Sequence, residues 1–240
     1  MKPAQSQRTI VYSHVVSLSH PIGPGIPLWP GDPPLELKTV ARWSQDGFFL
    51  QRFVLGEHSG THLNAPRHFF PQGEAVDGLD PASLVVEAVV LDCRKAAAED
   101  PDYTLQPADV ERWEAEHGPI PQRSLVVLWT GWHQRWHDPV AFFNKGDDGR
   151  MHFPGFAPSA VDFLIQERHV SGFGTDTHGI DPGLDETFAA NRLALAKEKL
   201  VLENLTNLHR LPPTGATLVI GVLPLQGGSG SPVSVLAFIP

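Results

Sequence analysis

The sequence is poor in features that define whole classes of protein. It holds one cysteine, Cys93, which excludes an intrachain disulfide. Its 18 lysine and arginine residues are outnumbered by 27 acidic residues, the formal charge is −9, and the basic residues form no cluster. Nucleic acids and anionic membrane surfaces both require a basic footprint, so we expect neither as a partner. The partner that this composition favours is a small molecule.

Long apolar runs are also missing. The longest, Leu84–Leu91 and Leu218–Leu225, are far too short to cross a bilayer. The first ten residues, MKPAQSQRTI, lack the apolar centre of a signal peptide. Together with the single cysteine, these features lead us to expect a protein of the reducing cytoplasmic compartment.

The chain does have enough apolar material for one large core. Of its 240 residues, 41% are hydrophobic and only 19% are charged, and neither a repeat nor a linker divides them. We therefore expect residues 1–240 to form a single domain.

Apolar and β-branched runs alternate with helical patterns along that domain. The expected helices are Pro107–His117, which has proline in its first turn and Gly118 as its stop, and Pro158–Arg168. The expected strands are Ile10–Leu18, Phe48–Leu55, Ser83–Leu91, Ser124–Thr130, Val170–Gly174, Leu200–Leu202, Thr217–Val222 and Val233–Phe238. Nearly continuous apolar strands are typical of a sheet that is covered on both faces. The pattern predicts an α/β fold with a mixed or parallel sheet and helices packed outside it.

The segment Pro21–Pro34 is too rich in proline and glycine for a helix or a central strand, because proline lacks an amide donor. We expect an ordered surface arm. Trp29 lies in its middle, where regular structure would not bury it. Its indole could line a ligand pocket, contribute to a subunit interface, or simply attach the arm to the domain.

Three histidines, His58, His62 and His68, fall within the segment Glu57–Phe70. Gly60 and Pro66 favour a loop over a helix, and no glutamate follows His58 as a zincin would require. Neutral imidazole is a common metal ligand and a common general base near pH 7. The segment is therefore a candidate metal or catalytic site, with a histidine-rich surface loop as the alternative.

Other candidate groups lie at turns. Glu203 is flanked by leucines, and a buried carboxylate is costly unless it is paired or binds a cation; Arg192 and Arg210 are possible partners. His178 lies in a polar loop and is a weaker candidate.

The glycine-rich stretch Gly227–Pro232 lacks the lysine of a phosphate-binding loop. No G-x-S-x-G elbow occurs in the sequence, and Cys93 ends a buried strand, so a serine or cysteine hydrolase is disfavoured.

The stretch GTHLNAPRHF, residues 60–69, resembles the signature His-x-Gly-Thr-His-x-Asp-x-Pro-x-His-Phe of the metal-dependent cyclase family, which includes bacterial kynurenine formamidase and isatin hydrolase. Further motifs follow the family's order: WPGDPP, LWTGW, GTDTHGIDP, ENLTNL and GGSGSPVSVLAF. The resemblance covers nearly the whole chain. It implies one α/β domain around a curved, barrel-like mixed sheet, assembled as a homodimer or homotetramer. It also implies hydrolysis of an amide-type bond by metal-bound water.

By this resemblance, His58 and His62 fall on metal ligands and His68 on the histidine that acts as acid and base. Glu203 matches a metal-binding glutamate. Two positions depart from the pattern: Asn64 stands where the family has an aspartate that bridges two ions, and Asn191 where a second-site histidine is expected. A neutral amide is a poor bridge, because it offers one weak donor and no charge. We therefore predict one divalent ion, zinc or manganese, held by His58, His62, Asn64 and Glu203, and a degraded second site.

The expected chemistry is removal of a proton from water by His68 and its return to the departing amine. Aromatic residues near the histidines (Trp29, Phe69 and Phe70), with His178, suit a flat substrate such as N-formylkynurenine or a cyclic amide. The rival hypothesis is a metal-poor relative that binds a small aromatic molecule, or serves as a scaffold, without turnover.

Overall fold

A computed structural model describes residues 9–240. We expected no signal peptide in the first ten residues; residues 1–8 of that stretch lie outside the described part. The strands are β1 (His14–Ser17), β2 (Glu36–Ala41), β3 (Leu50–Val54), β4 (His62–Asn64), β5 (Val85–Asp92), β6 (Thr104–Leu105), β7 (Leu125–Trp129), β8 (Gly155–Phe156), β9 (Gly172–Thr175), β10 (Leu200–Glu203), β11 (Ala216–Val222) and β12 (Gly230–Ile239). The helices are α1 (Trp43–Asp46), α2 (Arg94–Glu99), α3 (Pro107–His117), α4 (Pro139–Phe143), α5 (Pro158–Glu167) and α6 (Ala189–Ala196). Single turns of 3-10 helix include η1 (Pro66–His68).

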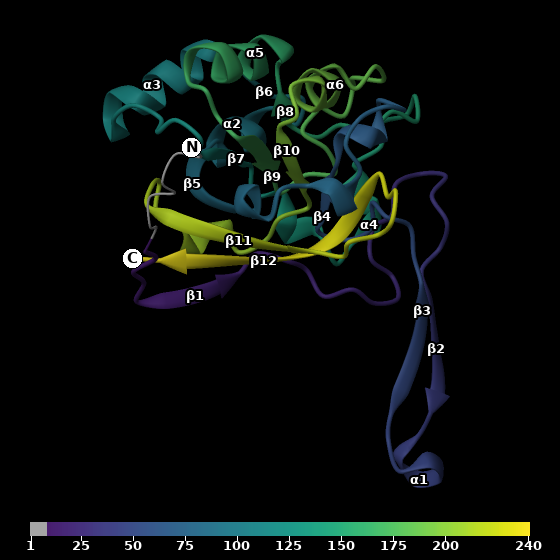
Figure 1. Cartoon of the computed structure of the whole chain (residues 1–240). Helices are drawn as coiled ribbons and strands as arrows, with labels where there is room; N and C mark the ends of the chain where they lie inside the picture. The colour runs from purple at the N-terminus through teal and green to yellow at the C-terminus, as the bar shows by residue number, and fades with distance from the viewer. Residues whose placement is uncertain (1–8) are drawn as a thin grey trace.

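One mixed sheet dominates the fold. Its strands follow the order β1-β12-β11-β5-β7-β9-β10-β4, and β4 also pairs with β12, so seven strands close into a barrel with β1 attached to the outside of the ring. Strands β5, β7, β9 and β10 run parallel, and the remaining pairs are antiparallel. Helices α3, α5 and α6 lie together over the parallel part (Figure 1). The predicted α/β class with a mixed, curved, barrel-like sheet in one domain is confirmed.

Two apolar layers explain why the parallel strands appear in the sequence as continuous apolar runs. Side chains alternate between the two faces of a strand. On β5, Val86, Ala88 and Val90 face the barrel interior, whereas Val89 and Leu91 face the layer beneath the helices. Because both layers exclude water, both sets of positions must be apolar.

The helix predicted at Pro107–His117 is α3, with the predicted bounds. Its first turn is held by the Asp109 carboxylate, which accepts a hydrogen bond from the Gln106 amide at 2.9 Å. Helix α5 ends one residue before the predicted Arg168. The predicted strands are present with shifted ends, and the first is reduced to His14–Ser17.

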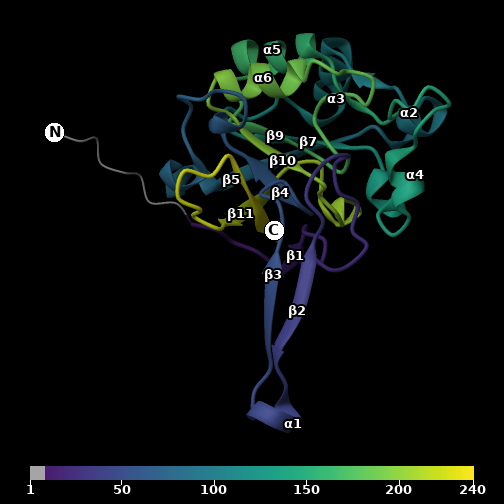
Figure 2. The ribbon, with the colours of Figure 1, turned by 90° about the vertical axis from the view of Figure 1, so that its right-hand side faces the viewer.

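Other expectations were incomplete. The histidine segment was predicted as a loop, but His62–Asn64 form β4, because β10 and β12 pair with these residues from the two sides. The strand expected at Phe48–Leu55 exists as β3, yet it pairs with β2 in a separate two-stranded sheet. That hairpin, capped by α1, projects far from the body (Figures 1 and 2). Helix α6 was not predicted.

Within residues 9–240, every helix is too short or too polar to span a bilayer.

The glycine-rich stretch Gly227–Pro232 has a structural role. Gly230 begins β12 and pairs with Asn64 of β4. A methyl group on Gly230 would lie 2.5 Å from Cε1 of His58 and 2.7 Å from the carbonyl oxygen of Leu63. Only glycine therefore permits the His58 ring and β4 to approach β12 this closely.

We predict that Gly230→Ala lowers the free energy of unfolding by about 1–3 kcal/mol, the usual cost of forcing extra volume into a packed site. Urea unfolding measures the change. The control is Gly23→Ala, because a methyl group on Gly23 would meet no atom within 4 Å. Equal stability of the two variants would contradict the proposed close packing.

Candidate functional site

All predicted site residues except Phe70 come together in one cavity of about 210 Å³. Strand β4 supplies His62 and Asn64, the preceding loop supplies His58, and η1 ends at His68. Strand β10 supplies Glu203 from the other side, where it pairs directly with His62. The complete lining consists of Trp29, Asp32, His58, His62, Asn64, His68, Phe69, Phe153, His178, Gly179, Asp181, Pro182, Asp185, Phe188, Asn191 and Glu203.

His62 and Glu203 form the centre of the site. Both are buried, and His62 Nε2 lies 3.0 Å from Glu203 Oε2. The other ring nitrogen of His62, Nδ1, lies 2.9 Å from the carbonyl oxygen of Gly60. Burial opposes ionisation of Glu203, but the hydrogen bonds from His62 and Asn191 outweigh it and hold the pKa of this carboxyl below its usual value. The partner of Glu203 is thus a site histidine, not Arg192 or Arg210.

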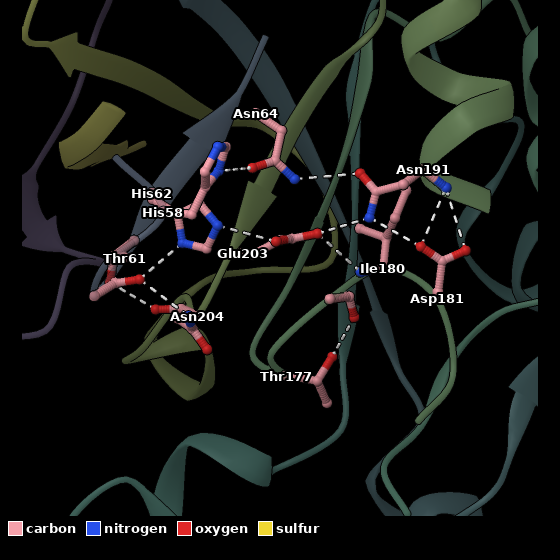
Figure 3. Close-up of polar contacts among 12 residues, drawn as sticks. His58, Thr61, His62, Asn64, Thr177, Ile180, Asp181, Asn191, Glu203 and Asn204 are labelled. Atoms are coloured by element: carbon pink, nitrogen blue, oxygen red, sulfur yellow. Dashed lines mark hydrogen bonds and ion pairs between the residues drawn. The ribbon is translucent and has the colours of Figure 1, made fainter. Parts of the chain in front are cut away.

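A chain of amide hydrogen bonds connects Glu203 to His58 (Figure 3). Asn191 Nδ2 donates to Glu203 Oε1 at 2.9 Å and to Asp181 Oδ2 at 2.9 Å. Asn191 Oδ1 accepts from Asn64 Nδ2 at 3.2 Å. Asn64 Oδ1 in turn lies 2.8 Å from His58 Nδ1.

This series of amide hydrogen bonds places a proton on Nδ1 of His58. Two carboxylates accept from the amide nitrogen of Asn191, so the carbonyl oxygen of Asn191 must face Asn64. Asn64 then turns its own oxygen to His58, whose Nδ1 must carry the proton. The second nitrogen, Nε2, lies 3.0 Å from Ser229 Oγ. Burial, followed by the neighbouring histidines, lowers the pKa of His58 to about 4, so the ring is neutral at pH 7.

Asp176 and Asp181 both belong to the GTDTHGIDP motif around His178, but they lie in different surroundings. Asp181 accepts hydrogen bonds from the α6 amides of Ala190 and Asn191. Burial raises the pKa of Asp181 to about 6. Asp176 is fully buried elsewhere, bound to Thr130 and 2.9 Å from His133 Nδ1. Only Asp181 contributes to the cavity.

His178 is buried in an aromatic cage. Its ring stacks on Phe143 and meets Phe142 and Trp29 edge to face. Burial lowers the pKa of His178 to about 3, so the ring is neutral. Its Nε2 atom is buried without a hydrogen-bond partner in the described structure. An unpaired polar atom in a cavity wall is costly, which marks it as a position for a polar atom of a ligand.

His68 lies at the mouth of the cavity. It is exposed on one side, and its ring lies 3.9 Å from that of His58. Desolvation in this position lowers the pKa of His68. Its ring is therefore neutral at pH 7 and able to accept a proton.

The aromatic wall differs in part from the sequence expectation. Trp29 lines the cavity and also packs on the cluster formed by Trp132 and its neighbours, so it both faces the ligand space and attaches the arm. Phe69 lines the cavity. Phe70, which we expected to contact substrate, does not line the cavity; like Phe69, it packs against the apolar layer beneath the helices.

Sequence reasoning missed several lining residues. Asp32 and Asp185 both line the cavity, and burial raises the pKa of Asp32. Phe188 lines it from the residue before α6, with a positive φ of 56°. Asp32 lies within the WPGDPP motif, which was a usable signal. Phe188 and Asp185 precede an unpredicted helix and carried no signal of their own.

The donor set of the site is suited to one divalent ion. The imidazoles of His58 and His62, the ionised Glu203 and the side chain of Asn64 all line one cavity. Within residues 9–240, however, no group of three histidine, cysteine or acidic side chains is placed so that it could hold a metal ion. An ion would replace the hydrogen bond between His62 and Glu203 and one of those made by His58. The remaining oxygen of Glu203 accepts a hydrogen bond from the side-chain amide of Asn191.

Comparison with known proteins places this geometry in a family. The Cyclase family model (Putative cyclase) matches residues 16–182. Isatin hydrolase of Roseibium aggregatum is 36% identical over 94% of this chain and 92% of that protein. Kynurenine formamidase of Erythrobacter litoralis is 27% identical over 78% of this chain and 77% of that protein. Both relatives are hydrolases.

Solved structures of isatin hydrolases resemble this fold. Isatin hydrolase A from Ralstonia solanacearum has a TM-score of 0.89 at 33% identity, and the match covers 95% of this chain and 92% of that one. An isatin hydrolase bound to the product analogue thioisatinate has a TM-score of 0.88 at 35% identity, and the match covers 94% and 92%. The family model over residues 16–182 and the 36% identical relative show that this chain belongs to the cyclase family.

Proposed function

We propose that this protein hydrolyses an amide-type bond in a small, neutral aromatic substrate with the help of one divalent ion. The observation that carries the proposal is the convergence of His58, His62, His68 and Glu203 on one cavity with an aromatic wall. Its relatives of known name, isatin hydrolase and kynurenine formamidase, support a hydrolase.

The charge of the cavity favours a neutral substrate. Four carboxylates line it, those of Asp32, Asp181, Asp185 and Glu203, and neither lysine nor arginine is among its described lining residues. A single divalent ion offsets only part of this negative charge. A cyclic amide of the isatin type fits such a cavity better than an aryl formamide that carries a carboxylate. Hydrolysis of a cyclic amide creates a carboxylate, and the acidic walls would favour its release.

Each group of the chain has a role in this proposal. Trp29, Phe69 and Phe188 hold the aromatic ring, and the free Nε2 of His178 makes a hydrogen bond to a polar atom of the substrate. His68 takes a proton from the attacking water and returns it to the departing nitrogen. The ion, held by His58, His62 and Glu203 beside Asn64, would polarise the carbonyl group as a Lewis acid.

The amides of Asn64 and Asn191 set the number of ions. They leave the site with one carboxylate ligand. Compared with a site that has two carboxylate ligands, it would be more positive when an ion is bound, and it would bind the ion less tightly.

We predict at most one tightly bound equivalent of zinc or manganese per chain, measured by elemental analysis after dialysis. Asn64→Asp should raise the affinity for the first ion, because it adds an anionic donor to the same cavity. The double variant Asn64→Asp/Asn191→His should admit a second ion. Two equivalents in the unaltered protein would refute the single-ion assignment.

The activity is tested with metal-loaded protein against a panel of neutral cyclic aryl amides, aryl formamides and lactones. We expect turnover with the neutral cyclic amides, and slower turnover with analogues that carry a carboxylate. His68→Ala should lower kcat by about 100-fold or more, the usual contribution of general acid–base catalysis, with metal content unchanged.

The matched control for His68→Ala is His14→Ala, because His14 is exposed on β1, in a part of the barrel that does not line the cavity. Near-normal turnover by His68→Ala would remove this residue from the role. Ligand-induced thermal stabilisation across the panel without turnover would favour the rival hypothesis of a non-catalytic aromatic binder or scaffold.

A further inference from the structure

Asn204 directly follows Glu203 at the end of β10, and it lies beside Thr61 and near His62 in Figure 3. Its side chain is buried. The Nδ2 atom of Asn204 donates a hydrogen bond to the carbonyl oxygen of Gly60 at 3.0 Å. The ring atom Nδ1 of His62 lies 2.9 Å from the same oxygen. One carbonyl group therefore joins Asn204 to a histidine of the site.

The shared carbonyl group of Gly60 determines which way the His62 ring faces. A carbonyl oxygen only accepts hydrogen bonds, and its two lone pairs can take one from Asn204 and one from His62. Nδ1 of His62 is therefore the donor of its pair, and this bond fixes the plane of the ring. The other ring nitrogen, Nε2, then lies 3.0 Å from Oε2 of Glu203. Nε2 is the His62 atom that is left for an ion in the proposed site.

The turn that carries this carbonyl group is held from β10. Gly60 has a φ of 66°, and a glycine has no side chain that restricts rotation of the backbone on either side of it. Asn204 binds the turn at two points: Nδ2 donates to the Gly60 carbonyl oxygen, and the backbone oxygen of Asn204 accepts from Thr61 Oγ1 at 2.6 Å. The direction of the Gly60 carbonyl group thus depends on the residue that follows Glu203.

Asn204 occupies its position in a conformation that stability alone does not favour. Its φ is 58°, in the left-handed region that most residues with a side chain avoid. Its Oδ1 atom is buried and has no hydrogen-bond partner among the described residues. A buried oxygen without a partner destabilises a fold and calls for an explanation. The need for an N–H donor that faces Gly60 supplies one.

We propose that Asn204 is a positioning residue for His62: through the carbonyl group of Gly60 it fixes the plane of the ring and the direction of Nε2 toward Glu203. Because Glu203 and Asn204 are consecutive, one strand end presents the carboxylate and also orients the imidazole opposite it. Partners of this kind hold a metal-binding histidine in one orientation. The expected effect on metal binding rests on the proposed function, whereas the orientation of the ring does not require an ion.

Zinc affinity is the first test. Asn204→Gly removes the side chain, and glycine adopts the left-handed backbone without strain. The matched control is Asn207→Gly: Asn207 has a φ of 57°, its Nδ2 donates to the carbonyl oxygen of Ser17 at 2.9 Å, and it does not line the cavity. In competition with a chromophoric chelator, the Kd of the full chain for zinc should rise about 10-fold or more in Asn204→Gly and change less than about two-fold in Asn207→Gly.

The second test observes the ring in the metal-free full chain. NMR spectroscopy of isotope-labelled protein detects the Nδ1 proton of His62, which is identified by its loss in His62→Gln. This proton should be protected from exchange with solvent in the unaltered protein and in Asn207→Gly. It should exchange faster in Asn204→Gly, because the accepting carbonyl group is then free to move. A change confined to overall stability would not separate the two asparagine variants in this way.

Circular dichroism verifies that the variants are folded. If Asn204→Gly does not fold, Asn204→Asp replaces it, because this change keeps the shape of the side chain and replaces the donor by an acceptor. Equal exchange of the His62 ring proton in the unaltered protein and in a folded Asn204 variant overturns the proposal. Equal weakening of zinc binding by the Asn204 and Asn207 variants overturns it as well. If the unaltered chain binds no zinc, the proposed function fails, and the exchange measurement alone decides the role of Asn204.

Discussion

The site depends on a three-residue strand that two other strands hold from opposite sides. Strand β4 pairs with β10 and with β12, and this double pairing closes the barrel. The same register sets His62 opposite Glu203 and brings Gly230 opposite Asn64. Because a slip of one residue in a strand turns every side chain to the other face, closure and site geometry cannot be changed separately. Barrel closure is thus also the step that assembles the donor set.

Within that frame, two amides change the electrostatics of the cavity. Asn64 and Asn191 use both ends of their side chains, and their hydrogen bonds run from the carboxylates of Asp181 and Glu203 to His58. These hydrogen bonds satisfy the side-chain oxygens and nitrogens of both amides without adding charge, which is the condition under which a buried network is stable. It also keeps Glu203 ionised beside His62. The arrangement leaves Glu203 as the carboxylate that faces His62 and uses the two amides for orientation.

The fold was predictable wherever local signals were strong. Proline and glycine mark the ends of α3, and the apolar runs mark β5 and β7, because each signal lies within the element itself. Strand β4 was not predictable in this way: its pairing comes from segments about 140 and 170 residues later, and Gly60 and Pro66 suggested a loop locally. Among site residues, the histidines and Glu203 were identified from spacing and from motif resemblance. Phe188 and Asp185 were not, since they enter the cavity only because α6 packs beside it.

The projecting hairpin of β2, α1 and β3 and the cavity pose opposite problems for a chain of this composition. The cavity places acidic groups in a protected space and satisfies them with hydrogen bonds, whereas the hairpin exposes aromatic groups to water. Exposed apolar surface is unfavourable by about 25 cal/mol per Å², so a sequence that keeps eight large apolar residues, four of them aromatic, exposed on one hairpin requires a compensating contact. The body does not supply it, since β2 and β3 point away from it (Figure 1). Asp32 and His58, which line the cavity, lie directly before and after this hairpin in the sequence, so the hairpin leaves the body beside the site.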